Sequence, residues 1–254
     1  MTEARFTGRV ALVTGAASGI GRSVALRLAA EGADVFAVDV NEPGLADTAA
    51  AAARELVTHR ADVSQAAQCV AAVAECVRRF GRLDILGNIA GIARAEHFAE
   101  VSESDYRQMM GVNVDGYFFL CQAAIPHLLT DRGDGSAGVI VNIASNAGLM
   151  GQAFTVVYSM TKGAVVQLTK SLAMEFMKSP LRVVGIAPGG VETGLVHGYQ
   201  MPGDVDFDLV GRYMGFRGLA QPEDIAHLFA FLCSDEARNI HGTVVSSDGG
   251  MTAG

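Results

Sequence analysis

The sequence predicts an α/β protein, a doubly wound parallel β-sheet of about seven strands with helices on both faces. Short apolar runs of strand length alternate with segments of helical periodicity along nearly the whole chain. The runs are almost continuously apolar, as in strands buried on both faces. Half of the 254 residues are apolar and 18% are charged, which provides a buried core and excludes a disordered or fibrous protein.

Each expected strand is followed by a helical or irregular segment long enough to cross over to a parallel neighbour. The first run, VALVT, ends at Gly15, and later runs such as DVFAVDV and GVIVNI have the same apolar character. The expected strands are, in chain order, 10–14, 34–40, 56–61, 85–88, 138–143, 183–187 and 243–246. The expected helices are 19–31, an Ala-rich segment ending near 54, 64–80, 104–130 and 155–178.

No linker or change of composition divides the chain, so residues 1–254 are expected to form a single domain. Residues 188–218 are the exception to the alternation, because they are rich in glycine and carry no strand or helix pattern. Long irregular insertions in compact domains are usually functional. Ligands of parallel sheets bind beyond the carboxyl ends of the strands, where this segment begins. We therefore expect a substrate-binding loop at about 188–218.

Charge and apolar pattern restrict the partners. The net charge of −8 opposes nucleic-acid binding, which needs a basic face. The longest uncharged window, 135–161, contains Asn, Gln, Ser and Thr, so no membrane partner is expected. Residues 1–8 lack the apolar core of a signal peptide, and we expect a cytoplasmic protein that binds a small molecule. The four cysteines show no metal or redox spacing and are expected to be reduced core thiols.

A glycine-rich turn follows the first expected strand. It reads Thr14-Gly15-Ala-Ala-Ser18-Gly19-Ile20-Gly21, directly before a helix. Glycines allow a tight turn and let a pyrophosphate approach the N–H groups at a helix N-terminus. The spacing differs from the strict G-x-G-x-x-G fingerprint, but its place between strand and helix favours a dinucleotide site.

Asp39 indicates which dinucleotide binds. It closes the second expected strand, 18 residues after Gly21, where a carboxylate accepts hydrogen bonds from both adenosine-ribose hydroxyls. A 2′-phosphate at that point would meet the same negative charge. Because Ser18 in the turn and Val40 and Asn41 after the strand are not basic, the sequence favours NAD over NADP.

Tyr158 and Lys162 form a pair four residues apart on an expected helix, so the phenol and the ammonium share one face. A cation near a phenol favours the phenolate and lowers the pKa of the tyrosine from about 10. Ser145 lies just past the fifth expected strand, 13 residues earlier, and can face the same pocket.

Together these segments resemble the short-chain dehydrogenase/reductase family over essentially the whole chain. The matching segments are Thr14-Gly15-x-x-x-Gly19-Ile20-Gly21, Asp62-Val63, Asn88-Ile89-Ala90-Gly91, Asn113, Ser145, Tyr158-x-x-x-Lys162, Pro188-Gly189-Gly190-Val191-x-Thr193, Gln221-Pro-Glu-Asp-Ile-Ala and Val245-Ser-Ser-Asp248-Gly-Gly. Two positions depart from the family pattern, since Ile89 and Ala187 stand where Asn is usual.

The resemblance implies a Rossmann fold and hydride transfer between the nicotinamide and a carbinol or carbonyl carbon. It implies that Tyr158 is the acid/base, that Lys162 lowers the pKa of Tyr158 and holds the nicotinamide ribose, and that Ser145 donates to the substrate oxygen. Asn113 would hold a water that connects Lys162 to solvent, no metal is required, and a homotetramer is implied. The implied cofactor contacts are Gly15, Ser18, Gly19, Ile20, Gly21, Asp39, Asp62, Val63, Asn88, Ala90, Gly91, Tyr158, Lys162, Pro188, Gly189, Val191 and Thr193.

The loop composition predicts the substrate class. Its carboxylates outnumber its two arginines, which disfavours a strongly anionic substrate. Its apolar and aromatic side chains favour a secondary alcohol or ketone; they are Tyr199, Met201, Phe207, Tyr213, Met214 and Phe216. Three alternatives stay open: an NADPH-dependent reductase of 3-oxoacyl thioesters on acyl-carrier protein, a sugar or polyol dehydrogenase, and a non-catalytic dinucleotide-binding regulator.

Overall fold

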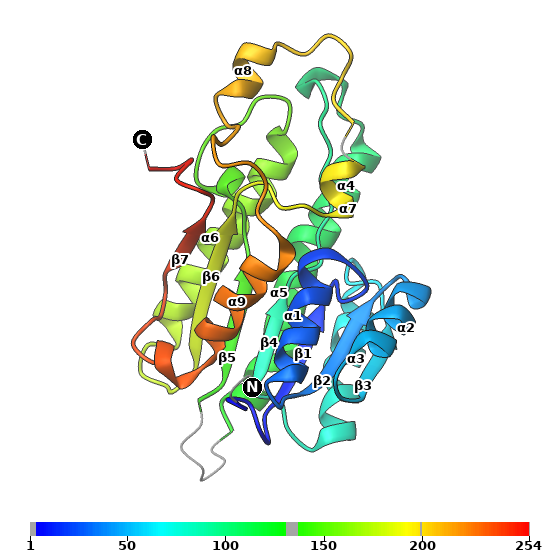
Figure 1. Cartoon of the computed structure of the whole chain (residues 1–254), viewed down its shortest axis with the longest axis vertical. Helices are drawn as coiled ribbons and strands as arrows, with labels where there is room; N and C mark the ends of the chain where they lie inside the picture. The colour runs from blue at the N-terminus through cyan, green and yellow to red at the C-terminus, as the bar shows by residue number, and fades with distance from the viewer. Residues whose placement is uncertain (1–3, 131–136, 199, 254) are drawn as a thin grey trace.

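The computed structural model describes residues 4–130, 137–198 and 200–253. Within these residues seven strands form one parallel sheet, in the order β3-β2-β1-β4-β5-β6-β7 (Figure 1). The strands are β1 (Val10–Thr14), β2 (Asp34–Asp39), β3 (Leu56–Arg60), β4 (Ile85–Asn88), β5 (Val139–Ile143), β6 (Arg182–Pro188) and β7 (Val244–Ser247). Each lies within one residue of the expected run at both ends, so the predicted sheet is confirmed.

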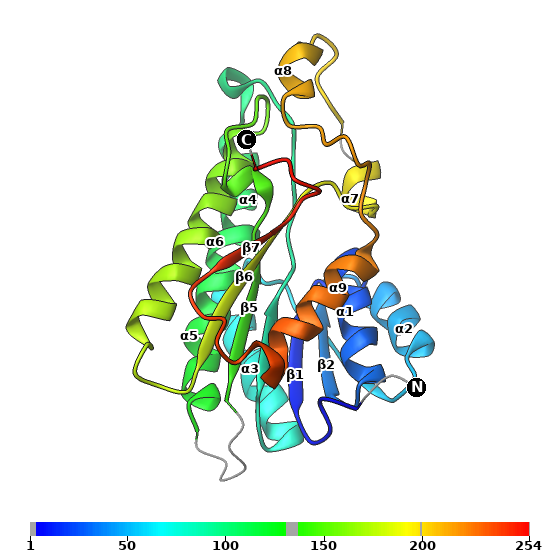
Figure 2. The ribbon, with the colours of Figure 1, turned by 60° about the vertical axis from the view of Figure 1, so that its left-hand side comes forward.

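Helices cover both faces of the sheet, as Figures 1 and 2 show. One layer consists of α1 (Gly19–Ala30), α2 (Glu42–Ala51) and α9 (Pro222–Cys233), and the other of α3 (Ala66–Phe80), α5 (Gly116–Leu128) and α6 (Val156–Glu175). Alternate residues of β1 serve the two layers: Ala11 and Val13 pack in the core under α1 and α9, whereas Val10 and Leu12 pack under α3 and α5. This is the two-residue period of a strand buried on both sides.

The helix α9 was not expected from the sequence. It begins with a capping box between Gln221 and Asp224, with Pro222 in its first turn. Both are helix start signals. Its apolar face carries Ile225 and Phe229, both fully buried against the sheet. The residues Gln221–Asp224 therefore carry helix start signals in addition to the family resemblance.

The expected helix 104–130 is interrupted. It consists of α4 (Glu103–Met110), a π-helical turn η2 (Gly111–Asp115) and α5. A π-turn adds one residue to a helix without changing the apolar pattern on either side, so periodicity does not reveal it. The residue at the centre of the π-turn, Asn113, is buried, and its side chain reaches the candidate active site described below.

The described residues of the segment 188–218, called the lid below, include two short helices, α7 (Gly194–His197) and α8 (Phe207–Gly211). It rises from the carboxyl end of β6 and extends above the sheet at the top of Figure 1. Tyr213 connects this segment to the loop before α6, because its hydroxyl donates to the carbonyl of Ala153 at 2.9 Å. Tyr199, one of the aromatic residues expected at the substrate, lies outside the described residues.

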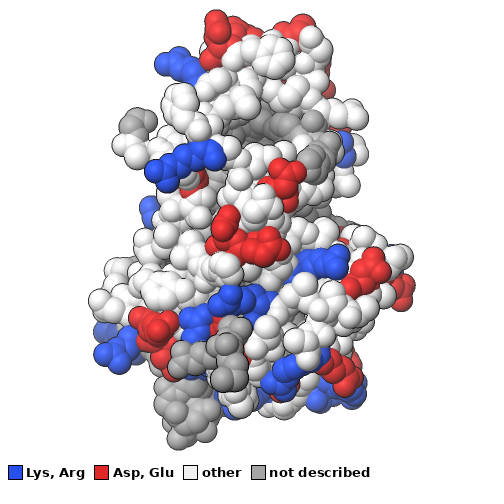
Figure 3. Space-filling view, in the orientation of Figure 1, with Lys and Arg blue, Asp and Glu red and all other residues white. Residues whose placement is uncertain are grey.

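The four cysteines are buried and free, as expected, and burial raises the pKa of each thiol, for example to about 12 for Cys121. No helix in the described part of the chain is long and apolar enough to cross a membrane. Basic and acidic side chains are interspersed on the face shown in Figure 3, with acidic residues gathered over α8.

Candidate active site

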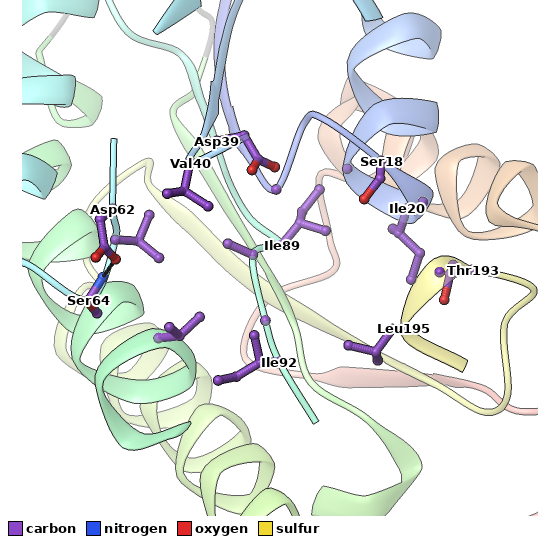
Figure 4. Close-up of a pocket in the computed structure, with 18 of the residues that line it drawn as sticks. Ser18, Ile20, Asp39, Val40, Asp62, Ser64, Ile89, Ile92, Thr193 and Leu195 are labelled. Atoms are coloured by element: carbon purple, nitrogen blue, oxygen red, sulfur yellow. Dashed lines mark hydrogen bonds between the residues drawn. The ribbon is translucent and has the colours of Figure 1, made fainter. Parts of the chain in front are cut away.

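The sheet places a cleft at the point where its strand order reverses. β1 lies between β2 and β4, so the segments that follow these strands diverge at their carboxyl ends and leave a crevice. The cleft has a volume of about 510 Å³. Asp39, Asp62 and Thr193 approach it from three sides in Figure 4.

The glycine-rich turn forms one wall of this cleft. Gly15 has a φ of +69°, which favours glycine, and a Cβ on Gly21 would lie 2.1 Å from the carbonyl oxygen of Gly15. The turn is therefore compact enough for its N–H groups to face the cleft at the start of α1. Ser18 is the N-cap of that helix, yet its side chain makes no capping bond, which leaves the first N–H groups for an anion.

Asp39 has the geometry expected of a ribose acceptor. Its Oδ2 accepts from the Ala17 N–H at 3.0 Å and its Oδ1 from the Asn41 N–H at 2.9 Å, which fixes the carboxylate at the edge of the cleft. The remaining lone pairs of both oxygens are available for hydroxyl donors. Sequence reasoning missed a basic neighbour, because Arg60 is the register partner of Asp39 across the β2–β3 ladder. Neighbouring strands bring these side chains to one face, although they are distant in sequence.

Thr14 is a second residue that sequence reasoning did not assign. Its hydroxyl accepts from the N–H groups of Ile89 and Ala90 at 2.9 and 3.1 Å and donates to the Gly87 carbonyl. It thereby fastens the end of β4 beside the glycine-rich turn. A Cβ on Gly15 would lie 3.0 Å from Ala90, so the two walls of the cleft meet here. The sequence feature that could have indicated this role is the position of Thr14 directly before the glycine-rich turn.

Most of the expected cofactor contacts do line the cleft or the cavity that continues it. Asn88 does not. Its side chain is fully buried and donates to Asn142 Oδ1 at 2.9 Å and to the Cys121 sulfur, so it supports the sheet below the cleft. The cleft also contains Ile89 from the Asn88–Gly91 segment, and residues outside the matched segments, from the ends of strands, the α4–η2 segment and the lid; they are Val40, Ala61, Ser64, Ile92, Gln108, Val112, Gly194 and Leu195.

A cavity of about 110 Å³ continues the cleft toward β5 and α6. Ser145, Tyr158 and Lys162 all line it, so the structure brings together the three side chains that the sequence had placed in one pocket. The rest of its wall comes from the end of β5, from the end of β6 with the segment after it, which includes Pro188 and Gly189, and from residues shared with the cleft. The two spaces share the residues Ile20, Ile89, Gly91, Thr193 and Leu195.

Burial controls the ionisation of Lys162 and Tyr158. The Lys162 ammonium donates to the Ile143 carbonyl at 2.8 Å and lies between the rings of Tyr117 and Tyr158, at 5.4 and 5.8 Å from their centroids. Desolvation lowers the pKa of Lys162 to about 7.

The expected lowering of the Tyr158 pKa is not found in the structure. Burial of the phenol hydroxyl raises the pKa of Tyr158, and the Ser145 hydroxyl only partly opposes this rise. The expectation assumed a fully charged lysine in a watery site. Burial disfavours the charged form of both groups, so the cation is weakened by the same desolvation that raises the phenol pKa.

Asn113 lies behind the cavity and holds its wall. The side-chain amide bonds both backbone groups of Ile92, at 2.9 and 2.8 Å, and donates to the Thr161 hydroxyl. A Cβ on Gly91 would lie 3.4 Å from Asn113 Oδ1 and 3.6 Å from Lys162 Nζ, so Gly91 allows these two groups to approach. Both N–H groups of the Asn113 amide and its oxygen thus make hydrogen bonds within the protein.

Comparison with known proteins agrees with this geometry. Residues 15–252 match the family model described as "Enoyl-(Acyl carrier protein) reductase". The chain is 35% identical to meso-2,3-butanediol dehydrogenase of Serratia marcescens, over 98% of this chain and 96% of that protein. It is 39% identical to D-threitol dehydrogenase of Mycolicibacterium smegmatis, over 98% and 94% of the two chains. A crystal structure of the 3-ketoacyl-(acyl-carrier-protein) reductase of Brucella melitensis with NADH superimposes with a TM-score of 0.88, at 34% identity over 97% and 99% of the chains.

The doubly wound sheet, the glycine-lined cleft and the adjoining Ser–Tyr–Lys cavity define a dinucleotide-binding oxidoreductase. The chain belongs to the short-chain dehydrogenase/reductase family and is an oxidoreductase.

Proposed function

We propose that this protein is an NAD(H)-dependent dehydrogenase that interconverts a secondary alcohol and its ketone, with Tyr158 as the acid/base. The observation that carries the proposal is the cavity in which Ser145, Tyr158 and Lys162 converge at the end of the dinucleotide cleft. A site that holds the reacting carbon between a proton-transferring group and the cofactor needs this continuity.

The bound cofactor supplies the hydride acceptor or donor, and the residues of the chain handle the proton. Tyr158 takes the hydroxyl proton of an alcohol or returns it to a ketone oxygen. Ser145 donates a hydrogen bond to that oxygen where negative charge develops. Lys162, protonated, stabilises the phenolate beside it and binds ribose hydroxyls. Because both N–H groups of the Asn113 amide already donate within the chain, we expect its contribution to a proton path through water to come from its main-chain carbonyl.

NAD is proposed over NADP because the Asp39 carboxylate is fixed at the ribose end of the cleft. The test is thermal stabilisation by NADH and NADPH at matched concentrations. NADH is expected to raise the melting temperature clearly and NADPH little, since a ligand that binds the folded state stabilises it by mass action. Asp39→Ala should reduce the NADH shift.

Arg60 makes the test sharper. Its place beside Asp39 in the β2–β3 ladder makes it a candidate basic group for a 2′-phosphate. Arg60→Ala should leave the NADH shift intact. Comparable NADPH stabilisation that disappears in Arg60→Ala would reverse the proposed preference, whereas no shift with either cofactor would contradict the dehydrogenase.

The proposed substrate is a secondary alcohol or ketone of moderate size. The named relatives that act on butanediol and threitol support a small alcohol or polyol. The similar structure and the similar protein that are named as reductases of 3-ketoacyl or 3-oxoacyl groups favour a second candidate, a 3-oxoacyl reductase. Net charge −8 and the acidic residues over α8 oppose docking of an acidic carrier protein. Turnover of 3-oxoacyl thioesters above that of simple ketones would favour the second candidate.

A cytoplasmic homotetramer built on the long helices is part of the same proposal. α5 and α6 expose large apolar side chains on their outer sides, namely Phe118, Val156, Met160 and Met174. Symmetric association would remove this surface from water.

A further inference from the structure

The proton of the Ser145 hydroxyl is directed away from the reacting centre. Ser145 Oγ accepts from the Ala147 N–H at 3.1 Å and lies 3.1 Å from Asn146 Oδ1. A carbonyl oxygen has no proton, so the hydroxyl must be the donor in the second bond. A serine hydroxyl has a single proton, which Asn146 receives here; the Ser145 bond that opposes the rise of the Tyr158 pKa requires this proton to turn toward the phenolate.

The orientation of the Asn146 amide is fixed by its other neighbours. Its Nδ2 faces the Met251 sulfur at 3.3 Å, and a thioether can accept a hydrogen bond but cannot donate one. Its Oδ1 also accepts from Gln152 Nε2 at 3.2 Å. If the amide were turned over, its NH2 group would face the NH2 group of Gln152 and its oxygen would face sulfur. Asn146 Oδ1 is therefore an acceptor for two donors, and the residue is only 6% exposed.

Catalysis requires a different arrangement of the same proton. When Ser145 donates to the reacting oxygen, Asn146 Oδ1 loses one of its two donors while it stays buried. A buried acceptor left short of partners is unfavourable, so a substrate that brings its own donor to this point binds better. The oxygen in question lies 3.1 Å from Ser145 Oγ, which itself lines the cavity.

We propose that Asn146 and Gln152 form a subsite for a second oxygen on the carbon next to the reacting one. The substrate class is then the vicinal diols and the α-hydroxy ketones derived from them. The neighbouring hydroxyl donates to Asn146 Oδ1 and replaces the bond that Ser145 withdraws. Gln152 holds Asn146 from the side of the lid, beside Ala153, which accepts the Tyr213 hydroxyl. This proposal rests on the proposed secondary-alcohol chemistry and adds to it the specificity of the same cavity.

The test compares substrates that differ by one oxygen. Oxidation of 2,3-butanediol is measured against 2-butanol with NAD, and reduction of acetoin against 2-butanone with NADH. In the unmodified protein kcat/KM is expected to be at least about 10-fold higher for the compound with the second oxygen, about one lost hydrogen bond. Asn146→Leu, similar in size but without the amide, should bring this ratio close to one. Gln152→Met should lower it as well, and provides the test if Asn146→Leu does not fold.

Asn239→Leu is the matched control, because this exposed asparagine lies in the loop before β7, at the amino ends of the strands, whereas Asn146 follows the carboxyl end of β5. It should leave the ratio unchanged. A ratio near one in the unmodified protein, or a ratio that survives both Asn146→Leu and Gln152→Met, would overturn the second-oxygen subsite and leave the secondary-alcohol function standing. Failure to turn over any of the four compounds would count against both.

Discussion

Tyr158 and Lys162 show how the protein interior changes the chemistry of single residues. Both side chains belong to α6 and reach the same cavity, where burial raises the pKa of the phenol and lowers that of the ammonium to about 7. The lysine is therefore close to its titration point at neutral pH. Burial thus moves the two pKa values in opposite directions, and of the two groups only Lys162 titrates near neutral pH.

Tyr158→Phe is expected to lower kcat by about 10² to 10⁴-fold, because general acid–base catalysis contributes that factor. The phenyl ring keeps the cavity wall, so stabilisation by NADH should persist. Steady-state kinetics and thermal shifts measure the two effects separately. Tyr106→Phe, on α4, is the control with the same atomic change. A Tyr158→Phe protein with normal turnover would rule out the phenol as acid/base, and the absence of any turnover in the unmodified protein would favour the non-catalytic regulator.

Lys162→Met is expected to affect stability in a pH-dependent manner. The folded pKa of about 7 lies below the value of 10.5 for an unperturbed lysine, so between these pH values the unfolded chain holds more protons. The stability of the unmodified protein then rises with pH in this window, by up to about 1.4 kcal/mol per pH unit. The stability of Lys162→Met relative to it should therefore be greatest near pH 6.5 and fall toward pH 9.5.

Thermal or urea unfolding of the cofactor-free protein at the two pH values measures this difference. The lost bond to the Ile143 carbonyl lowers stability equally at both, so the change with pH is the informative quantity. The exposed Lys170→Met serves as the control on the same helix. A difference that stays constant between pH 6.5 and 9.5 would show that Lys162 does not titrate in this range.

At the scale of elements, the turn between β1 and α1 depends on a close approach of backbone to backbone. Gly21 packs directly over Gly15, and Thr14 fastens the end of β4 beside it. The π-turn η2 has a related role on the opposite side, where Asn113 holds Ile92. These irregular elements, rather than the regular strands, shape the cleft.

Gly21→Ala is expected to destabilise the protein by about 1–3 kcal/mol or more, because its Cβ would lie 2.1 Å from the Gly15 oxygen and the turn must open. Stabilisation by NADH should be lost with it. Gly163→Ala is the matched change in a helix, where the nearest atom to a new Cβ is 4.0 Å away, and it should be neutral or stabilising. Equal effects of the two substitutions in thermal unfolding would contradict the role given to Gly21.

At the scale of the whole molecule, the two helical layers share one sheet and pack on its two faces. We therefore expect cofactor binding, the lid and the core to depend on the same folded unit. The large apolar side chains on the outer sides of α5 and α6 are exposed to solvent in the single chain. We expect them to be buried in contacts with other copies of the same chain.

Sedimentation at micromolar concentration is expected to give a tetramer, four times the chain mass of 26.5 kDa. Met160→Lys, on the exposed side of α6, should shift the protein toward smaller species, because a charge would be buried at the contact. Lys170→Met, an exposed change on the same helix, should leave the oligomeric state unchanged.

Calorimetry is expected to show one cooperative transition, as for a single domain. A monomer would contradict the assembly, and two separate transitions would contradict the single domain.

The sequence by itself determined the strands, the glycine-rich turn and the candidates for the reacting side chains. These depend on neighbours along the chain: apolar runs mark buried strands, and the spacing of Tyr158 and Lys162 follows from one turn of helix. The tertiary structure decided the position of Arg60 beside Asp39, the withdrawal of Asn88 below the cleft, the π-turn at Asn113 and the bond from Ser145 to Asn146. It also reversed the expected shift in the Tyr158 pKa. Strand register and burial bring together residues that are far apart in the chain, and only the folded molecule removes them from water.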